Sequence, residues 1–136
     1  MSEKFEVKRV KELLKVKEPI TIGPEASLRE AAKKMADHGI GFLPVVDEKG
    51  DLIGVISERD ITYAFGNGKE NSKVKDIMRT KIITVHENDT VAYAARLLSE
   101  YGIRHLVVVN DEGKLVGVFS IKDLTYGEGA LFSIIF

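Results

Sequence analysis

The stretch over residues 39–61 reads GIGFLPVVDEKGDLIGVISERDI, and a close copy, GIRHLVVVNDEGKLVGVFSIKDL, occupies residues 102–124. The wider segments 21–61 and 84–124 match without a gap at an offset of 63, and 14 of their 41 positions are identical. Repetition at a fixed offset indicates one structural unit used twice. We therefore expect a pseudo-twofold pair of units whose candidate sites also come in twos.

The first half of each copy predicts a strand followed by a helix. β-branched residues at 20–22 and at 82–85 suit a short strand. Ser27 stands three residues before a glutamate, which is the pattern of a capping box at a helix start, and Thr90 is its equivalent. Each helix is expected to end at a glycine that can adopt positive φ. These glycines are Gly39 and Gly102.

The second half of each copy predicts a hairpin followed by a short helix. Two apolar runs are separated by a polar turn that ends in glycine, which favours antiparallel pairing. The second helix of each copy begins at Ser57 or Ser120. The expected strands are 42–46 with 52–57, and 105–109 with 115–120.

Length and composition indicate an α/β (α+β) domain built from two β-α-β-β-α repeats. The chain has 136 residues, of which 44% are hydrophobic and 30% charged. Each half would be only marginally stable alone, so we expect one shared core. Residues 10–14 and 74–78 predict a short helix leading into each repeat. The predicted boundaries are repeat 1 over 8–65, a linker over 66–73, repeat 2 over 74–126 and an apolar tail over 127–136.

Several classes of protein are disfavoured. The chain has no cysteine and only three scattered histidines, so we expect no transition-metal site. A net charge of −1 gives no broad footprint for nucleic acid. We see no signal peptide or membrane span and expect a cytoplasmic protein. The apolar tail is too short to span a bilayer and is expected to pack on the domain or on a partner subunit.

The best candidates for chemistry stand where a strand runs into a helix. They are a serine, a cation and a carboxylate in the order Ser-x-x-Asp. A helix start attracts phosphate, a carboxylate can accept both hydroxyls of a ribose, and a cation can balance phosphate charge. The same pattern is also a capping box, and the sequence leaves both interpretations open. The two sets are Ser57, Arg59 and Asp60 in repeat 1, and Ser120, Lys122 and Asp123 in repeat 2.

The copies diverge at one place beside these motifs. Repeat 2 has Arg104 and His105 where repeat 1 has Gly41 and Phe42. A cationic pair at the start of a buried strand indicates an anionic partner, although a solvated strand end is an equal alternative. No nucleophile elbow, phosphate loop or dinucleotide fingerprint is present, so we expect no catalytic residues and no enzyme.

Together the repeated motifs resemble a tandem pair of CBS domains, also called a Bateman module, over residues 8–126. The resemblance implies two repeats packed through their small sheets, with two clefts that bind AMP, ADP, ATP or S-adenosylmethionine. It implies that Asp123 holds ribose, that Arg104, His105 and Lys122 face phosphate, and that residues of repeat 1 frame adenine. Those framing residues are Thr21, Ala26, Ile40 and Gly41. The other cleft would use Val55, Ser57, Arg59 and Asp60, with Thr84 from repeat 2.

We therefore interpret the chain as a stand-alone regulatory sensor of adenine nucleotides that needs no cofactor. The family resemblance also implies a homodimer, and a regulated partner protein is compatible with a sensor. Two alternatives stay open: an oligomerisation module with empty clefts, in which the tail 131–136 matters most, and a binder of S-adenosylmethionine or nucleic acid. Because repeat 1 lacks the basic pair, we expect the Asp123 site to bind phosphate better.

Overall fold

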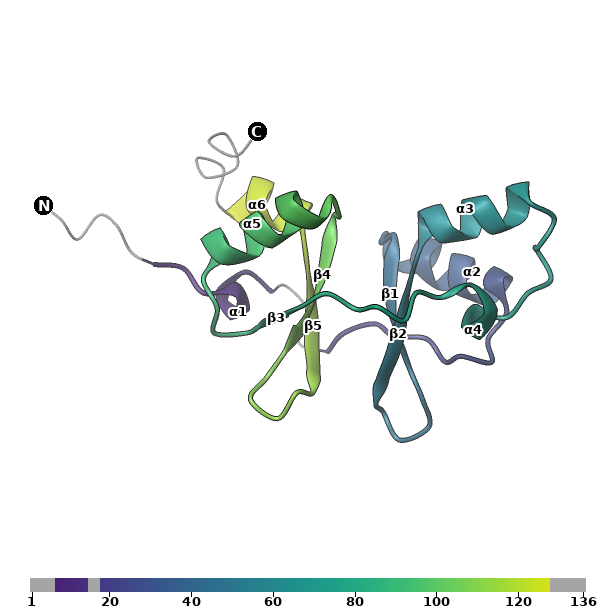
Figure 1. Cartoon of the computed structure of the whole chain (residues 1–136), viewed down its shortest axis with the longest axis horizontal. Coiled ribbons are helices and arrows are strands. Elements are labelled where there is room, and N and C mark those ends of the chain that lie inside the picture. The colour runs from purple at the N-terminus through teal and green to yellow at the C-terminus, as the bar shows by residue number, and fades with distance from the viewer. Residues whose placement is uncertain (1–6, 15–17, 128–136) are drawn as a thin grey trace, which may run out of the picture. The chain divides into compact units, whose positions relative to one another are not determined.

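The computed structural model describes residues 7–14 and 18–127, which divide into two compact units (Figure 1). The repeat-1 unit spans residues 20–82 and contains α2 (Leu28–His38), β1 (Phe42–Val46), β2 (Leu52–Ser57), α3 (Glu58–Gly66) and α4 (Val74–Ile77). The repeat-2 unit joins the described residues before Ile20 to those from Ile83 onward. Its elements are α1 (Val10–Leu13), β3 (Thr84–His86), α5 (Val91–Tyr101), β4 (His105–Val109), β5 (Leu115–Ser120) and α6 (Ile121–Gly127). The predicted α+β class is confirmed.

The first long helix of each unit starts and ends as predicted. At the start of α2, Ser27 Oγ accepts from the Glu30 N–H at 3.0 Å, and Glu30 Oε1 accepts from the Ser27 N–H at 2.9 Å. Thr90 Oγ1 caps α5 by accepting from the Tyr93 N–H at 3.1 Å. Gly39 and Gly102 end the two helices with φ of 64° and 61°, values that favour glycine.

The two hairpins share one turn chemistry. Asp47 Oδ1 accepts from the main-chain N–H of Lys49 and Asp51, at 3.0 and 2.9 Å. Asn110 Oδ1 makes the equivalent bonds in the β4–β5 turn, also at 3.0 and 2.9 Å. The register then shifts by one residue at the strand ends beside each turn. A short Asx side chain that satisfies its own turn therefore fixes the register of both hairpins.

The first predicted strand forms fully in only one unit. In the repeat-2 unit β3 pairs in parallel with β4, and the Val107 N–H donates to the Ile83 carbonyl at 3.3 Å. The position equivalent to Val107 in repeat 1 is Pro44, which has no N–H to donate. The predicted strand over 20–22 is therefore reduced to a single bridge between Ile22 and Val45, and this sheet has two strands where the other has three.

The lead-in helices are exchanged between the repeats. The sequence predicts that each lead-in helix belongs to the repeat that follows it in the chain. Instead, the Val10 N–H of α1 donates to the Asp89 carbonyl at 2.9 Å, and the Val74 N–H of α4 donates to the Ala26 carbonyl at 2.8 Å. In Figure 1 the purple α1 accordingly lies beside β3 and α5, whereas the teal α4 lies beside α2.

Each unit has its own hydrophobic cluster, and a core shared by the two units stays a prediction. Val10 and Val74 are fully buried, each in the cluster of the unit that receives its helix. An added helix enlarges the apolar surface that a small unit can bury. The repeat-1 cluster is centred on Leu28, Leu43 and Ile56. The repeat-2 cluster is centred on Leu106, Val108 and Phe119.

Candidate functional site

The repeat-1 junction joins β2 to α3 and is built around a buried carboxylate. Ser57 is the N-cap of α3, and its hydroxyl accepts from the Asp60 N–H at 3.2 Å. Asp60 Oδ2 in turn accepts from both the N–H and the hydroxyl of Ser57, each at 2.9 Å. The capping interpretation of Ser-x-x-Asp is therefore confirmed here, and the cap holds an 8% exposed Asp60 at the start of the helix.

A residue that the sequence analysis missed completes this junction. Arg79 follows α4 in the chain, and its main chain is bonded both ways to Val55 of β2, at 2.9 and 2.8 Å. Its guanidinium places Nε 3.0 Å and Nη2 2.9 Å from Asp60 Oδ1. The Asp60 side chain is 9% exposed and the Arg79 side chain 59%, so a solvated cation covers a buried acid.

The repeat-2 junction joins β5 to α6 with the same internal bond. Asp123 Oδ2 accepts from the Ser120 N–H at 2.8 Å and lies 3.4 Å from the Ser120 hydroxyl. Asp123 is half-buried. Both predicted Ser-x-x-Asp motifs therefore fold into equivalent strand-to-helix connections that position a carboxylate.

The residues flanking the two junctions differ in the sign of their charge. In repeat 1 the Glu58 side chain occupies the space that a Cβ on Gly41 would need, and the Glu58 N–H donates to the Gly41 carbonyl at 2.9 Å. In repeat 2 the equivalent main-chain bond runs from Ile121 to the Arg104 carbonyl, at 3.0 Å. Gly41 and Glu58 of repeat 1 therefore correspond to Arg104 and Ile121 of repeat 2. The flanking charge is negative at the first junction and positive at the second.

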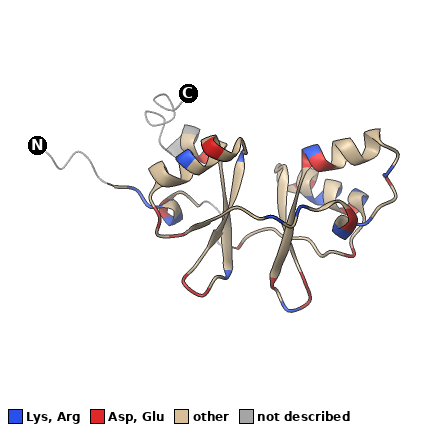
Figure 2. Ribbon diagram, viewed as in Figure 1, with Lys and Arg blue, Asp and Glu red and all other residues tan. Residues whose placement is uncertain are grey.

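Figure 2 shows that charge in each unit gathers on helices and turns while the strands are nearly uncharged, so the junctions are where charge meets the sheets. Arg104 and Lys122 are both exposed, and neither forms an ion pair within the described residues. Arg59, the repeat-1 equivalent of Lys122, instead bonds Tyr63 Oη through Nε at 3.2 Å and Nη2 at 3.0 Å. That bond raises the pKa of Arg59 above its usual value.

His105 is uncharged at neutral pH, which corrects our expectation of a cationic Arg104–His105 pair. Burial, together with the nearby positive charges of Lys122 and Arg104, lowers the pKa of His105 to about 4. The side chain can still hydrogen-bond, but the charge of this junction comes from Arg104 and Lys122.

The remaining predicted residues are divided between the two units. Val55 is buried in β2 beside Arg79. Thr21, Ala26 and Ile40 are half-buried in the repeat-1 unit. The Ala26 carbonyl accepts a hydrogen bond from the Val74 N–H at the start of α4. Thr84 is exposed at the start of β3 in the repeat-2 unit. The combination of residues from both repeats in one cleft stays a prediction.

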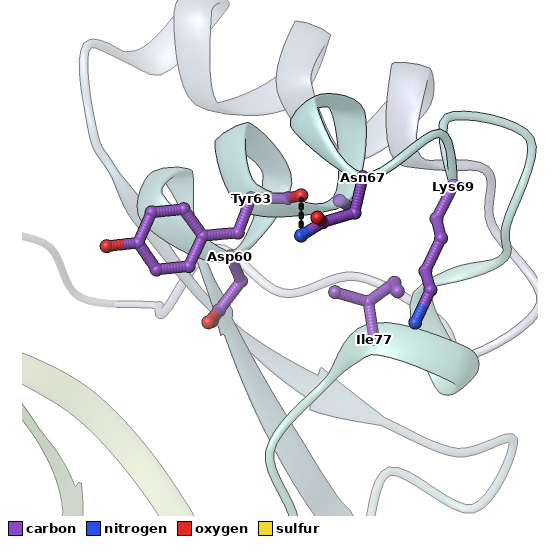
Figure 3. A pocket seen from close by; sticks show the side chains of 6 residues that line it. Asp60, Tyr63, Asn67, Lys69 and Ile77 are labelled. Atoms are coloured by element: carbon purple, nitrogen blue, oxygen red, sulfur yellow. Dashed lines mark hydrogen bonds between the residues drawn. The ribbon is translucent and has the colours of Figure 1, made fainter.

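A small open pocket of about 180 Å³ lies between α3 and α4 of the repeat-1 unit (Figure 3). Asp60 and Tyr63 form one side, and Lys69 and Ile77 lie across from them. The Asn67 amide donates to the Tyr63 carbonyl at 2.9 Å. Pockets that hold drug-sized ligands measure roughly 300–1,000 Å³, so this one is too small to enclose a nucleotide.

Within residues 7–14 and 18–127, no group of three or more histidines and acids could hold a metal ion. No helix in the same ranges has the length and apolar character to cross a membrane. The predicted tail lies outside the described residues, apart from its first residue.

Arg79 had one signal in the sequence. The lead-in segments 10–15 and 74–79 align at an offset of 64, and both end in a basic residue, Lys15 or Arg79. That one-residue shift leaves both residues outside the repeat alignment, which has an offset of 63. Lys15 lies outside the described residues.

The chain belongs to the CBS domain family, whose sequence profile matches residues 10–67 and 74–127. It is 40% identical over 119 residues to the uncharacterized protein MK0525 of Methanopyrus kandleri, covering 85% of this chain and 61% of that protein. It is 38% identical to the L-aspartate semialdehyde sulfurtransferase of Methanocaldococcus jannaschii, covering 85% of this chain but 22% of the enzyme. The chain therefore spans less than two thirds of the length of these relatives.

Solved structures of CBS domain pairs resemble more than nine tenths of the chain. The CBS domain pair of protein MJ0100, in complex with 5′-methylthioadenosine and S-adenosyl-L-methionine, is 36% identical with a TM-score of 0.85. That match covers 92% of this chain and 98% of the other. The CBS domain protein PAE2072 of Pyrobaculum aerophilum, complexed with AMP, is 34% identical with a TM-score of 0.84, covering 93% and 97%. The predicted tandem CBS pair is confirmed, and this fold binds adenosine-containing ligands in these relatives.

Proposed function

We propose that this CBS pair is a ligand sensor that binds an adenine nucleotide, AMP, ADP or ATP, at its two strand-to-helix junctions. The observation that carries the proposal is the pair of equivalent carboxylates, Asp60 and Asp123, each fixed by a serine at a helix start. A carboxylate held in this way can accept hydrogen bonds from both hydroxyls of a ribose. The AMP complex of PAE2072 supports the choice of nucleotide.

The repeat-2 junction is proposed as the better phosphate site. Arg104 and Lys122 supply two exposed cations beside Asp123, and the acid Glu58 of repeat 1 is replaced there by Ile121. Phosphate oxygens form strong charge-assisted hydrogen bonds with guanidinium and ammonium groups. The neutral His105 would add a hydrogen bond without charge.

A second candidate ligand is S-adenosylmethionine or 5′-methylthioadenosine, because the similar CBS pair of MJ0100 holds both. Neither molecule carries a phosphate, so neither would use the cations of repeat 2 in the same way. A preference for these ligands over AMP would therefore assign the junctions to ribose and adenine recognition alone.

We propose a regulatory role in place of an enzymatic one. Ligand binding would shift the conformation of a homodimer or of a regulated partner, by an amount limited to the difference in ligand affinity between the two states. Light scattering of the free and AMP-saturated protein would test the change in assembly.

Isothermal titration with AMP, ADP, ATP, S-adenosylmethionine and adenosine tests the central proposal, with GMP as the control for the base. We expect heat and a raised melting temperature from adenine nucleotides, because a ligand that binds only the folded state stabilises it. Absence of heat and of any thermal shift with all of these compounds would contradict the proposed function.

A further inference from the structure

The Asp60 carboxylate is surrounded by donors from its own unit, Ser57 at one oxygen and Arg79 at the other. A carboxylate offers about four lone-pair sites, two on each oxygen. Two donors from Ser57 bond Oδ2, at 2.9 Å each, and Arg79 Nε donates to Oδ1 at 3.0 Å, with Arg79 Nη2 in an ion pair 2.9 Å from the same oxygen. A ribose that donated two hydroxyls to Asp60 would therefore have to displace one of these partners.

Arg79 is the partner that can leave. The Ser57 bonds belong to the cap of α3, so breaking them would expose the start of the helix. The Arg79 side chain, by contrast, is 59% exposed and comes from a separate segment. Its main chain stays bonded to Val55 at 2.8 and 2.9 Å, so the side chain can swing away while the segment keeps its place.

We infer that Arg79 is a gate on the repeat-1 site, which competes with the ribose of the ligand for Asp60. This inference rests on the proposed function and adds a residue that sets the affinity and salt response of one site. The Asp60–Arg79 pair must open before Asp60 can accept ribose hydroxyls, so part of the binding free energy is spent on opening it. Arg79 therefore affects ligand binding only through its ion pair with Asp60.

The test uses adenosine, which carries no charge, so that a phosphate cannot recruit Arg79. All variants carry Asp123→Ala, which removes the repeat-2 site so that binding at repeat 1 is measured alone. Arg79→Gln and Arg79→Lys are each added to Asp123→Ala and compared with Asp123→Ala by itself. Lys81→Gln is the matched control, because Lys81 is an exposed cation two residues away in the same unit. Titrations are run at low and high KCl, and circular dichroism checks that each variant is folded.

We expect Arg79→Gln to bind adenosine about two- to fivefold more tightly than the background, since a half-solvated ion pair contributes modestly. Arg79→Lys should lie between the two, because lysine cannot form the same forked contact. Adenosine affinity of the background should rise with salt as the pair is screened, and that rise should vanish in Arg79→Gln. A purely structural role for Arg79 would not produce this loss of salt dependence.

Equal or weaker binding by Arg79→Gln, or an unchanged salt response, would overturn the gate. If the wild-type chain binds adenosine but Asp123→Ala abolishes all binding, repeat 1 is not a site; the gate falls, while the proposed sensor function stands with the repeat-2 junction as its site. If the wild-type chain binds no adenosine compound, both fall.

Discussion

The two strand-to-helix junctions share their backbone and differ in their charge. Both hold a serine and an aspartate in one capping arrangement. In the repeat-1 unit two acids, Glu58 and Asp60, face two cations, Arg59 and Arg79, of which one is bonded to Tyr63 and the other to Asp60. The described part of the repeat-2 junction has one acid, Asp123, beside two exposed cations.

This difference separates the role of the fold from the role of the site. The capping box sets where the carboxylate lies, because the helix start needs its N–H groups satisfied. The residues around it then decide whether that carboxylate is already occupied and whether phosphate is attracted. One backbone can therefore carry two sites of unequal chemistry.

The largest expected effect concerns His105, whose repeat-1 equivalent Phe42 does not titrate. The pKa of His105 is about 4 in the folded chain and near 6.5 when unfolded, so between these values the unfolded state binds more protons. The free energy of unfolding should therefore be constant above pH 6.5 and fall as pH drops toward 4, by at most about 3 kcal/mol.

Urea unfolding of the wild type and His105→Phe from pH 7 to 4 measures this effect, with the exposed His38→Gln as control. Subtracting the His105→Phe curve removes the titration of carboxylates common to both proteins. The difference in unfolding free energy between the wild type and His105→Phe should change with pH across this window. The difference between the wild type and His38→Gln should stay constant. Parallel curves would show that burial does not hold His105 neutral.

A smaller effect is expected where the exchanged lead-in segments pass the second strand of each hairpin. A Cβ on Gly54 would lie 2.6 Å from Met78 Sδ and 3.0 Å from the Arg79 carbonyl oxygen. A Cβ on Gly117 would meet only the end of the Leu14 side chain, at 2.9 Å. Because main chain yields less easily than a side-chain end, Gly54→Ala should cost about 2 kcal/mol and Gly117→Ala about 1 kcal/mol.

Thermal unfolding of both variants checks this ranking. Gly23→Ala is the control, since nothing lies within 4 Å of its added Cβ. A larger loss for Gly117→Ala than for Gly54→Ala would contradict the packing that we describe for the two lead-in segments.

The smallest effect concerns the acid that repeat 2 lacks. In the Asp123→Ala background, Glu58→Gln should tighten AMP binding about two- to threefold, because it removes an exposed negative charge near the bound phosphate. Glu48→Gln, in the hairpin turn, is the control for an exposed acid in the same unit. An equal change of AMP affinity in Glu58→Gln and Glu48→Gln would show that Glu58 does not specifically weaken AMP binding at the repeat-1 junction.

The repeat, the capping boxes and the hairpins could be predicted because local residues determine each of them. Ser27, Gly39 and the Asx residues of the turns act within a few positions of the chain. The reduced first strand of repeat 1 was missed, although Pro44 was visible as a residue that cannot donate a ladder bond.

The exchange of lead-in helices and the Asp60–Arg79 pair could not be predicted in the same way. Arg79 lies 19 positions from Asp60 and is brought to it by main-chain pairing with Val55. The neutrality of His105 depends on burial and on neighbouring cations, which sequence patterns do not supply. The charge at each junction thus depends on tertiary contacts, which only the structure shows.

Titration of AMP into Asp60→Ala and Asp123→Ala tests most directly whether the two junctions are unequal, with circular dichroism to confirm folding. We expect Asp123→Ala to weaken the tighter binding step about tenfold or more, because a hydrogen bond to a charged group is lost. Asp60→Ala should leave that step within about twofold, as expected for separate sites. A larger loss of the tighter step in Asp60→Ala would contradict the ranking of the two sites.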